Sequence, residues 1–150
     1  MPSPPQRRII KNDAGVWTVD GRPRETVTLL SHHHPPNAPS KSLITLLVTL
    51  PPNGATPPHT HGGASVQALI LRGASADQMN DETQPTVRRA GETFFEAPGC
   101  HHVVGENAGA EGEETVFYAV FLVDDEVVEG GLGGLVVLDV DVEGGKGQAV

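Results

Sequence analysis

The chain contains little cysteine and few basic residues, and each shortage argues against a class of proteins. It holds a single cysteine among 150 residues, so no disulfide can form within it, and we expect a reducing compartment and a cytoplasmic protein. Basic residues are also few, with 10 lysines and arginines against 19 aspartates and glutamates and a net charge of −9. This balance leaves no basic stripe for a phosphate backbone, which argues against a nucleic-acid partner.

Long apolar runs are missing as well. No run approaches the roughly 20 residues that span a bilayer, and the opening MPSPPQRRII lacks the apolar stretch of a signal peptide. We therefore expect no membrane partner. With four phenylalanines, one tryptophan and one tyrosine, few rings are available to line a pocket, so any cavity should be aliphatic.

Glycine and proline, by contrast, are abundant, at 18 and 13 residues. They separate short apolar, β-branched runs, which is typical of strands joined by turns. No ten-residue stretch repeats apolar residues with the 3.6-residue period of a helix. An all-β sandwich or barrel follows, with strands expected at 27–30, 42–50, 66–79 (broken at Gly73), 86–89, 93–96, 102–104, 115–123 and 132–142.

The length fits one domain with a core of its own. Residues 1–15 are polar and proline-rich, and we interpret them as an arm that could pair with a partner subunit. The folded domain should cover 16–143 and leave 144–150 as a flexible tail. Because the arm and the glycine-flanked run at 132–142 resemble edge strands that need covering, we expect a homodimer.

Seven histidines lie in three groups: 32–34, the pair His59 and His61, and the pair His101 and His102. Residues i and i+2 of a strand face the same side, so His59 and His61 can offer two imidazole nitrogens to one ion. A third ligand from another strand would complete a site that keeps positions open for a substrate. Taken alone, the pair fits ordinary surface or core histidines better than a metal site.

The surroundings of the histidines carry a resemblance to a known family. Residues 57–63, followed by 68–73, resemble the first motif of the cupins, G-x5-H-x-H-x3/4-E-x6-G. Residues 91–102 resemble the second, G-x5-P-x-G-x2-H-x3-N. The two motifs stand in the right order. The resemblance implies a double-stranded β-helix, the cupin jelly-roll barrel, with one divalent metal on His59, His61 and His102.

The chain also departs from these motifs. Asn53 occupies the first glycine position, Ala97 the proline position and Glu106 the final asparagine position. More important, Val66 stands where the family usually has a glutamate ligand, and Gln67 should face the opposite side of the strand. The resemblance then implies a three-histidine site, which suits Fe, Zn, Ni or Cu better than Mn.

Several further residues are candidates for a role at this site. Glu96 could act as a general base, Gln67 could bond a metal-bound water or point outward, and Tyr118 could contact substrate or pack in the core. His101 and Gln67 could support the ligands from outside. The remaining positions have simpler interpretations: a solvated loop for His32, His33 and His34, a small buried residue for Cys100, and solvated charge for Glu106 and the acidic loop that follows.

The resemblance implies several functions, and the residues leave them open. We expect a metal-dependent enzyme that acts on a small oxygenated molecule of phenolic, β-diketone or keto-acid type. The absent glutamate favours dioxygenase-like chemistry. One alternative is a metal-assisted decarboxylase or isomerase without redox chemistry, and another is a cupin that binds a small ligand without reaction.

Overall fold

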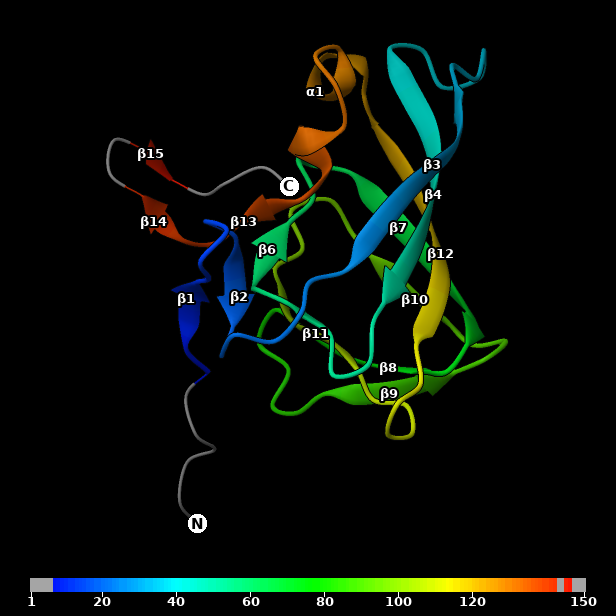
Figure 1. Cartoon of the computed structure of the whole chain (residues 1–150). Helices are drawn as coiled ribbons and strands as arrows, with labels where there is room; N and C mark the ends of the chain where they lie inside the picture. The colour runs from blue at the N-terminus through cyan, green and yellow to red at the C-terminus, as the bar shows by residue number, and fades with distance from the viewer. Residues whose placement is uncertain (1–6, 143–144, 147–150) are drawn as a thin grey trace.

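The computed structural model describes residues 7–142 and 145–146, and two antiparallel sheets form its body (Figure 1). The five-stranded sheet runs in the order β10 (Thr93–Glu96), β7 (Ser65–Arg72), β12 (Thr115–Asp124), β4 (Lys41–Leu50) and β3 (Thr26–His33). The six-stranded sheet runs β13 (Val137–Leu138), β6 (His59–Thr60), β11 (His102–Asn107), β8 (Ala74–Met79) and β9 (Thr86–Arg89), with β5 (Ala55–Thr56) also paired to β11.

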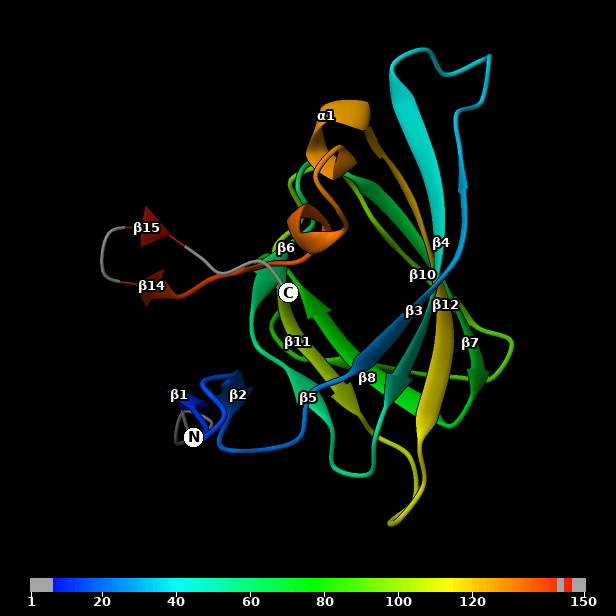
Figure 2. The same ribbon diagram turned by 45° about the horizontal axis from the view of Figure 1, so that its top comes forward.

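Smaller elements flank the sheets. Two hairpins stand beside the body in both views (Figures 1 and 2): β1 (Ile9–Lys11) with β2 (Trp17–Val19), and β14 (Asp141–Val142) with β15 (Gly145–Lys146). A four-residue helix α1 (Asp125–Val128) and a 3-10 turn η1 (Gly133–Leu135) connect β12 to β13. No helix in the described part of the chain is long and apolar enough to cross a membrane.

The five-stranded sheet follows directly from its sequence. Along β4 every second residue is buried, from Ser42 to Leu50, as the period of two in a strand requires. One inward row runs across four strands through their direct pairing: Glu96 on β10, Val66 on β7, Phe121 on β12 and Ile44 on β4. The apolar members of this row belong to the core between the sheets.

The chain crosses from one sheet to the other at Gly73, between β7 and β8. Its φ of +82° favours glycine, and a Cβ there would lie 2.5 Å from the Thr115 hydroxyl. The break predicted at this glycine is confirmed, as are the strands at 86–89 and 93–96. The all-β prediction is likewise confirmed.

Two other predicted segments need correction. The strand expected at 27–30 continues to His33, so His32 and His33 lie in a strand, although both side chains are exposed. The single strand expected at 132–142 is instead η1, β13 and β14, because the Gly133-Gly134 pair turns the chain. The strand expected at 102–104 extends to Asn107.

The first described residues fold back on their own chain. Arg7 donates two hydrogen bonds to Glu106, of 2.8 and 2.7 Å, and Arg22 donates a third of 2.6 Å. Burial raises the pKa of Glu106, but the two guanidinium groups outweigh it and hold this pKa below its ordinary value. Solvated charge was therefore the wrong expectation for Glu106. Residues 1–6 of the predicted arm, and 144 and 147–150 of the predicted tail, lie outside the described residues.

Candidate metal centre

Three histidines meet on the inner side of the six-stranded sheet. His59 on β6 and His102 on β11 are direct cross-strand partners, and His61 follows β6 by one residue. All three are buried, and one ring nitrogen from each lies within 4.8 Å of the others. The ring centroids of His59 lie 4.7 Å from His61 and 4.9 Å from His102. This cluster could hold a metal ion.

Each of these rings has one nitrogen occupied by a neighbour that only accepts hydrogen bonds. The acceptors are Pro57 O at 2.7 Å from His59 Nδ1, Leu135 O at 2.7 Å from His61 Nδ1, and Asp77 Oδ1 at 2.9 Å from His102 Nε2. The occupied nitrogen must therefore carry the proton, and in the neutral ring the other nitrogen keeps its lone pair. The three imidazoles, each with an assigned tautomer, thus offer three nitrogen lone pairs to one shared position between the rings.

Two glycines make this arrangement fit. Gly62 follows His61 with a φ of +62°, and a Cβ there would lie 2.4 Å from the Gly134 carbonyl oxygen. Because Gly62 has no Cβ, the loop after β6 can lie against η1. This packing brings the Leu135 carbonyl to His61. Gly105 leaves room for the ring of His102, because a Cβ on Gly105 would lie 3.1 Å from that imidazole.

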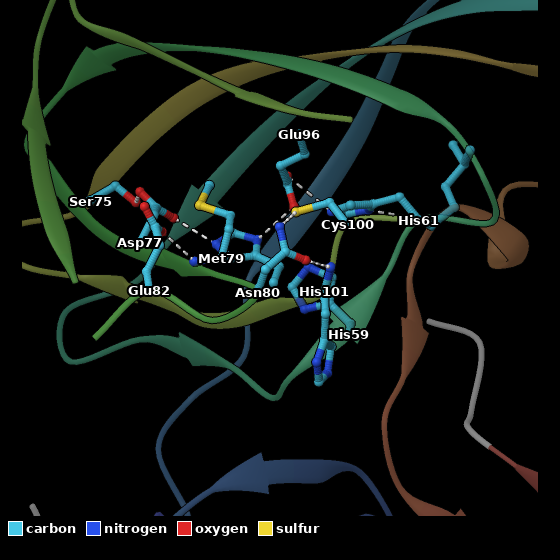
Figure 3. Close-up of polar contacts among 12 residues, drawn as sticks. His59, His61, Ser75, Asp77, Met79, Asn80, Glu82, Glu96, Cys100 and His101 are labelled. Atoms are coloured by element: carbon cyan, nitrogen blue, oxygen red, sulfur yellow. Dashed lines mark hydrogen bonds and ion pairs between the residues drawn. The ribbon is translucent and has the colours of Figure 1, made fainter. Parts of the chain in front are cut away.

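Two buried carboxylates flank the histidines. Glu96 is 2% exposed and Asp77 is 1% exposed. Glu96 Oε2 lies 3.1 Å from His61 Nε2, and Oε1 lies 3.4 Å from His102 Nδ1. Although close, neither contact has hydrogen-bond alignment, and both His61 Nε2 and Glu96 Oε1 lack a hydrogen-bond partner among the described residues. Figure 3 shows Glu96 directed toward His61, with Asp77 on the other side of the cluster.

The pKa directions in this cluster show how its charge is arranged. Burial, together with the neighbouring His102 and His61, holds the pKa of His59 well below its ordinary value. Burial also lowers the pKa of His102, but the hydrogen bond to Asp77 and the charge of Glu96 outweigh it and raise this pKa. The pKa of Glu96 is lowered despite burial, because His61 and His102 stabilise its anion. Near neutral pH the cluster combines a neutral His59 with an ionised Glu96.

These groups match the donors that a divalent transition metal takes. Imidazole nitrogens suit Zn, Cu, Fe and Ni, and an unpartnered buried lone pair is costly unless a cation or donor meets it. Lone pairs of His61 and His102 face carboxylate oxygens, so one cation between them would satisfy both kinds of group. The residues present therefore fit a metal ion.

A cavity opens from the histidines toward the five-stranded sheet. Its volume is about 70 Å³, counted as the space open to the centre of a water molecule, which is room for several waters or one small organic molecule. Its polar wall comprises Glu25, Thr56, Ser75, Asp77, Glu96 and the three histidines. The apolar wall includes Val27, Leu46, Val48, Leu50, Val66, Ala68, Phe94, Phe117, Ala119, Phe121 and Val136.

Three of the four phenylalanines line this cavity, so its wall is more aromatic than expected from composition. No lysine or arginine among the described residues reaches it. A guest molecule would meet hydrocarbon on one side and nitrogen and oxygen atoms on the other.

The other predicted site residues fall in different places. Val66 lines the cavity, while its neighbour Gln67 is exposed on the opposite face of β7. Tyr118 lies between Phe117 and Ala119 on β12. Both of these neighbours line the cavity, but Tyr118 does not. Of the three predicted catalytic candidates, the geometry brings only Glu96 to the histidines.

The remaining histidines lie away from the cavity. His101 Nε2 lies 3.0 Å from an Asp139 carboxylate oxygen, with its side chain 39% exposed. His32 bonds Ser42 at 2.9 Å and His34 bonds Asp125 at 3.0 Å, so neither points toward the metal cluster. Their place near α1 separates them from the site.

Cys100 is buried, as expected for a small core residue. Burial and the neighbouring charge of Glu96 raise the pKa of its thiol to about 11. The thiolate is therefore scarce at neutral pH, which disfavours a role as nucleophile or metal ligand.

Asp77, Ser75 and Leu135 were not predicted. Asp77 accepts a 2.8 Å hydrogen bond from Ser75 and fixes the tautomer of His102. Leu135 acts through its backbone carbonyl, which no residue pattern marks. A carboxylate two residues after a serine on a strand is the one signal available for Asp77, and it is weak.

Comparisons with known proteins give the fold. No protein-family model matches the sequence, and no curated protein matches it. Among solved structures, the Cnp3 cupin domain of Schizosaccharomyces pombe superposes with a TM-score of 0.55 at 17% identity, covering 67% of this chain and 65% of that domain.

Two further structures are similar. A protein with a double-stranded β-helix domain from Klebsiella pneumoniae gives a TM-score of 0.54 at 17% identity, covering 80% of this chain and 93% of its own. Oxalate oxidase in complex with the substrate analogue glycolate gives 0.51 at 24% identity, covering 67% of this chain and 51% of its own. Together with the two antiparallel sheets, these likenesses show that the chain has the cupin fold, a double-stranded β-helix.

Proposed function

We propose that this protein is a metal-dependent enzyme that acts on a small oxygen-bearing organic molecule. The observation that supports it most is the meeting of three buried imidazole lone pairs, from His59, His61 and His102, at one end of a cavity. Imidazoles in a purely structural role would be expected to have both ring nitrogens hydrogen-bonded or in contact with water. Here His61 Nε2 forms no hydrogen bond with any protein group among the described residues.

A divalent transition metal held by these histidines would act as a Lewis acid on a substrate oxygen and, if it is redox-active, could activate dioxygen. The protein's own groups define what could bind beside it. Phe94, Phe117 and the aliphatic wall would contact the carbon skeleton of a bound substrate. Asp77, held by Ser75, keeps the His102 proton on Nε2, so that Nδ1 faces the cavity with its lone pair.

Within this proposal, oxygen-dependent chemistry on a phenol, a β-diketone or a keto acid is the first reaction to test. The support comes from the three imidazoles, since redox-active Fe and Cu both accept imidazole ligands. An anionic enolate or phenolate would also complement a cation in a cavity that contains no lysine or arginine among its described residues.

A second candidate is a decarboxylase or isomerase without redox chemistry. The buried Glu96 favours it, because this carboxylate lines the cavity and is ionised near neutral pH. A carboxylate so placed can accept a proton from a substrate carbon or hydroxyl at its Oε1, which has no hydrogen-bond partner.

Elemental analysis and oxygen consumption test the proposal together. Protein purified without chelator should hold close to one transition-metal ion per chain by mass spectrometry, and His59→Ala should hold none. Oxygen uptake with phenols, β-diketones or keto acids would support the dioxygenase. Carbon dioxide release or isomerisation under nitrogen would support the second candidate. A metal-free protein that gains no metal on titration, yet binds small ligands, would overturn the enzyme proposal and favour a binding protein.

A further inference from the structure

The sequence leaves this site without the glutamate that the first cupin motif usually supplies, because Val66 stands in its place. The structure puts a different carboxylate beside Val66, on the neighbouring strand. Val66 on β7 and Glu96 on β10 are direct cross-strand partners, and both side chains face the cavity. On one sheet face, directly paired residues have Cβ atoms about 4.5–5.5 Å apart. A glutamate on β10 can therefore reach the region that a glutamate at position 66 would occupy.

The distances from Glu96 to two of the ring nitrogens are those expected between neighbouring ligands of one ion. Two donor atoms that each lie about 2.1 Å from one ion, at angles of 90° to 109°, are about 3.0–3.4 Å apart. Glu96 Oε2 lies 3.1 Å from His61 Nε2, and Oε1 lies 3.4 Å from His102 Nδ1. Neither contact is aligned for a hydrogen bond. The carboxylate thus stands beside two of the three nitrogens at the spacing of a shared coordination sphere.

Charge favours the same arrangement. A divalent ion on three neutral imidazoles would carry its full charge into a buried cavity, and burying unpaired charge is costly. Glu96 is itself buried, with no lysine or arginine beside it in the cavity wall. An ion bound to Glu96 would halve the excess charge and give this carboxylate the counter-charge that it lacks.

We infer that Glu96 is the fourth protein ligand of the metal, replacing from the neighbouring strand the glutamate that is absent at Val66. The inference rests on the metal site proposed above. It changes the ligand set from three histidines to three histidines and one carboxylate. Because carboxylate oxygen suits Mn(II), that ion joins Fe, Zn, Ni and Cu among those the site can hold.

Titration of the full-length, metal-free protein with Co(II) and Mn(II) tests this inference. The readouts are affinity by competition with a chelator, the visible spectrum of bound Co(II), and the electron paramagnetic resonance of Mn(II). Glu96→Gln keeps the size of the side chain and removes its charge. It should lower Co(II) affinity at least about 10-fold, the lower end of what even outer residues contribute, change the Co(II) spectrum, and weaken Mn(II) more than Co(II).

A matched pair of double variants returns the carboxylate to one of two neighbouring positions. When Val66→Glu is added to Glu96→Gln, the new carboxylate at position 66 faces the cavity. This double variant should recover most of the lost metal affinity. Gln67→Glu added to Glu96→Gln carries the same charge on the outer face of the same strand and should recover none. Circular dichroism of each metal-free variant confirms that it is folded.

The results separate this inference from the proposed function. If wild-type protein binds Co(II) but Glu96→Gln binds it with the same affinity and spectrum, Glu96 is not a ligand and acts at most as a base. If wild-type protein binds neither Co(II) nor Mn(II), the metal site itself is wrong, and the proposed function fails with it.

Discussion

The strands of the two sheets differ in length and in sequence pattern. In the five-stranded sheet β4 alternates strictly between buried and partly exposed residues, and β7 does so over most of its length. In the six-stranded sheet β8 buries Ser75 and Asp77 together with Ala74 and Ala76, and shows no alternation. The first sheet buries mainly apolar residues, with Glu96 as its buried carboxylate, whereas the second sheet buries the histidines together with Ser75 and Asp77.

This difference separates stability from chemistry. The apolar row of the five-stranded sheet gains free energy from burial, which any well-packed hydrocarbon supplies. The polar groups of the six-stranded sheet gain little from burial and need partners to offset the loss of water. Ser75 bonds Asp77, and Asp77 bonds His102. We therefore expect substitutions of apolar residues in the five-stranded sheet to change folding, and substitutions of histidines in the six-stranded sheet to change metal binding; Glu96 on β10 is the exception, a metal ligand that the five-stranded sheet supplies.

Replacing a ligand should have the largest effect. His59→Ala should remove stoichiometric metal, a loss in affinity of more than about 100-fold, since even outer residues contribute up to that amount. The matched control is His33→Ala, an exposed histidine of the five-stranded sheet, which should keep its metal. Equal metal content in the two variants would contradict the separation of the sheets.

A core substitution in the five-stranded sheet should lower stability and spare the metal. Ile44 is fully buried and does not line the cavity. Ile44→Ala should lower the free energy of unfolding of the metal-free protein by about 2–5 kcal/mol, measured by urea denaturation. Leu122→Ala, at a residue 37% exposed on the outer face, should cost about 1 kcal/mol or less. An Ile44→Ala variant that folds normally but loses metal would break the comparison.

The two glycines after His61 offer a finer test. Both have positive φ, but a Cβ would lie 2.4 Å from the Gly134 oxygen at Gly62 and would meet nothing within 4 Å at Gly63. Gly63→Ala should cost about 1 kcal/mol of backbone strain and leave metal affinity unchanged. Gly62→Ala should cost about 1–3 kcal/mol and also weaken metal binding, because it pushes η1 and the Leu135 carbonyl away from His61. Equal effects on metal affinity would show that η1 does not support the site.

The smallest effect concerns Glu106 on β11 of the six-stranded sheet, whose side chain is 16% exposed. Its pKa is lower in the folded protein than the ordinary value of 4.5, so its contribution is present above pH 4.5 and is lost as the pH falls through the folded value. Glu106→Gln should destabilise the protein by about 1 kcal/mol at pH 7, and by less below pH 4.5.

A control for this pair is Glu114→Gln, at a residue 48% exposed that pairs with Arg72. It should change the free energy of unfolding little at either pH. A Glu106→Gln penalty that stayed constant between pH 7 and pH 3.5 would mean that packing, not charge, holds this residue.

Sequence reasoning succeeded where one residue pattern decides the outcome. Apolar, β-branched runs indicated the strands β4, β7 and β12, and Gly73 was predicted as a break, although not as the point where the chain changes sheet. The His59 and His61 pair, with His102 at the matching position of the second motif, indicated the cluster that the structure forms. Each of these signals lies within a few residues of chain.

The rest depends on contacts that no local pattern contains. The approach of Glu96 to the histidines requires the register that pairs it with Val66, and the loop lengths between β7 and β10 leave that register open. Asp77 lies on a strand buried throughout, so alternation could not assign its face. The support of His61 by Leu135 comes from a backbone carbonyl, which every residue possesses.

The segment from η1 to β13 supports the metal site but is synthesised after the three histidines. Leu135 holds His61 through its carbonyl, and Leu138 pairs with His59 across the edge of the sheet. During synthesis the three histidines emerge before either leucine, with an interval on the order of seconds at cellular translation rates. A nascent chain that ends before residue 135 therefore presents His61 without the carbonyl that fixes its tautomer, and a metal met at that stage would bind a looser site than the finished one.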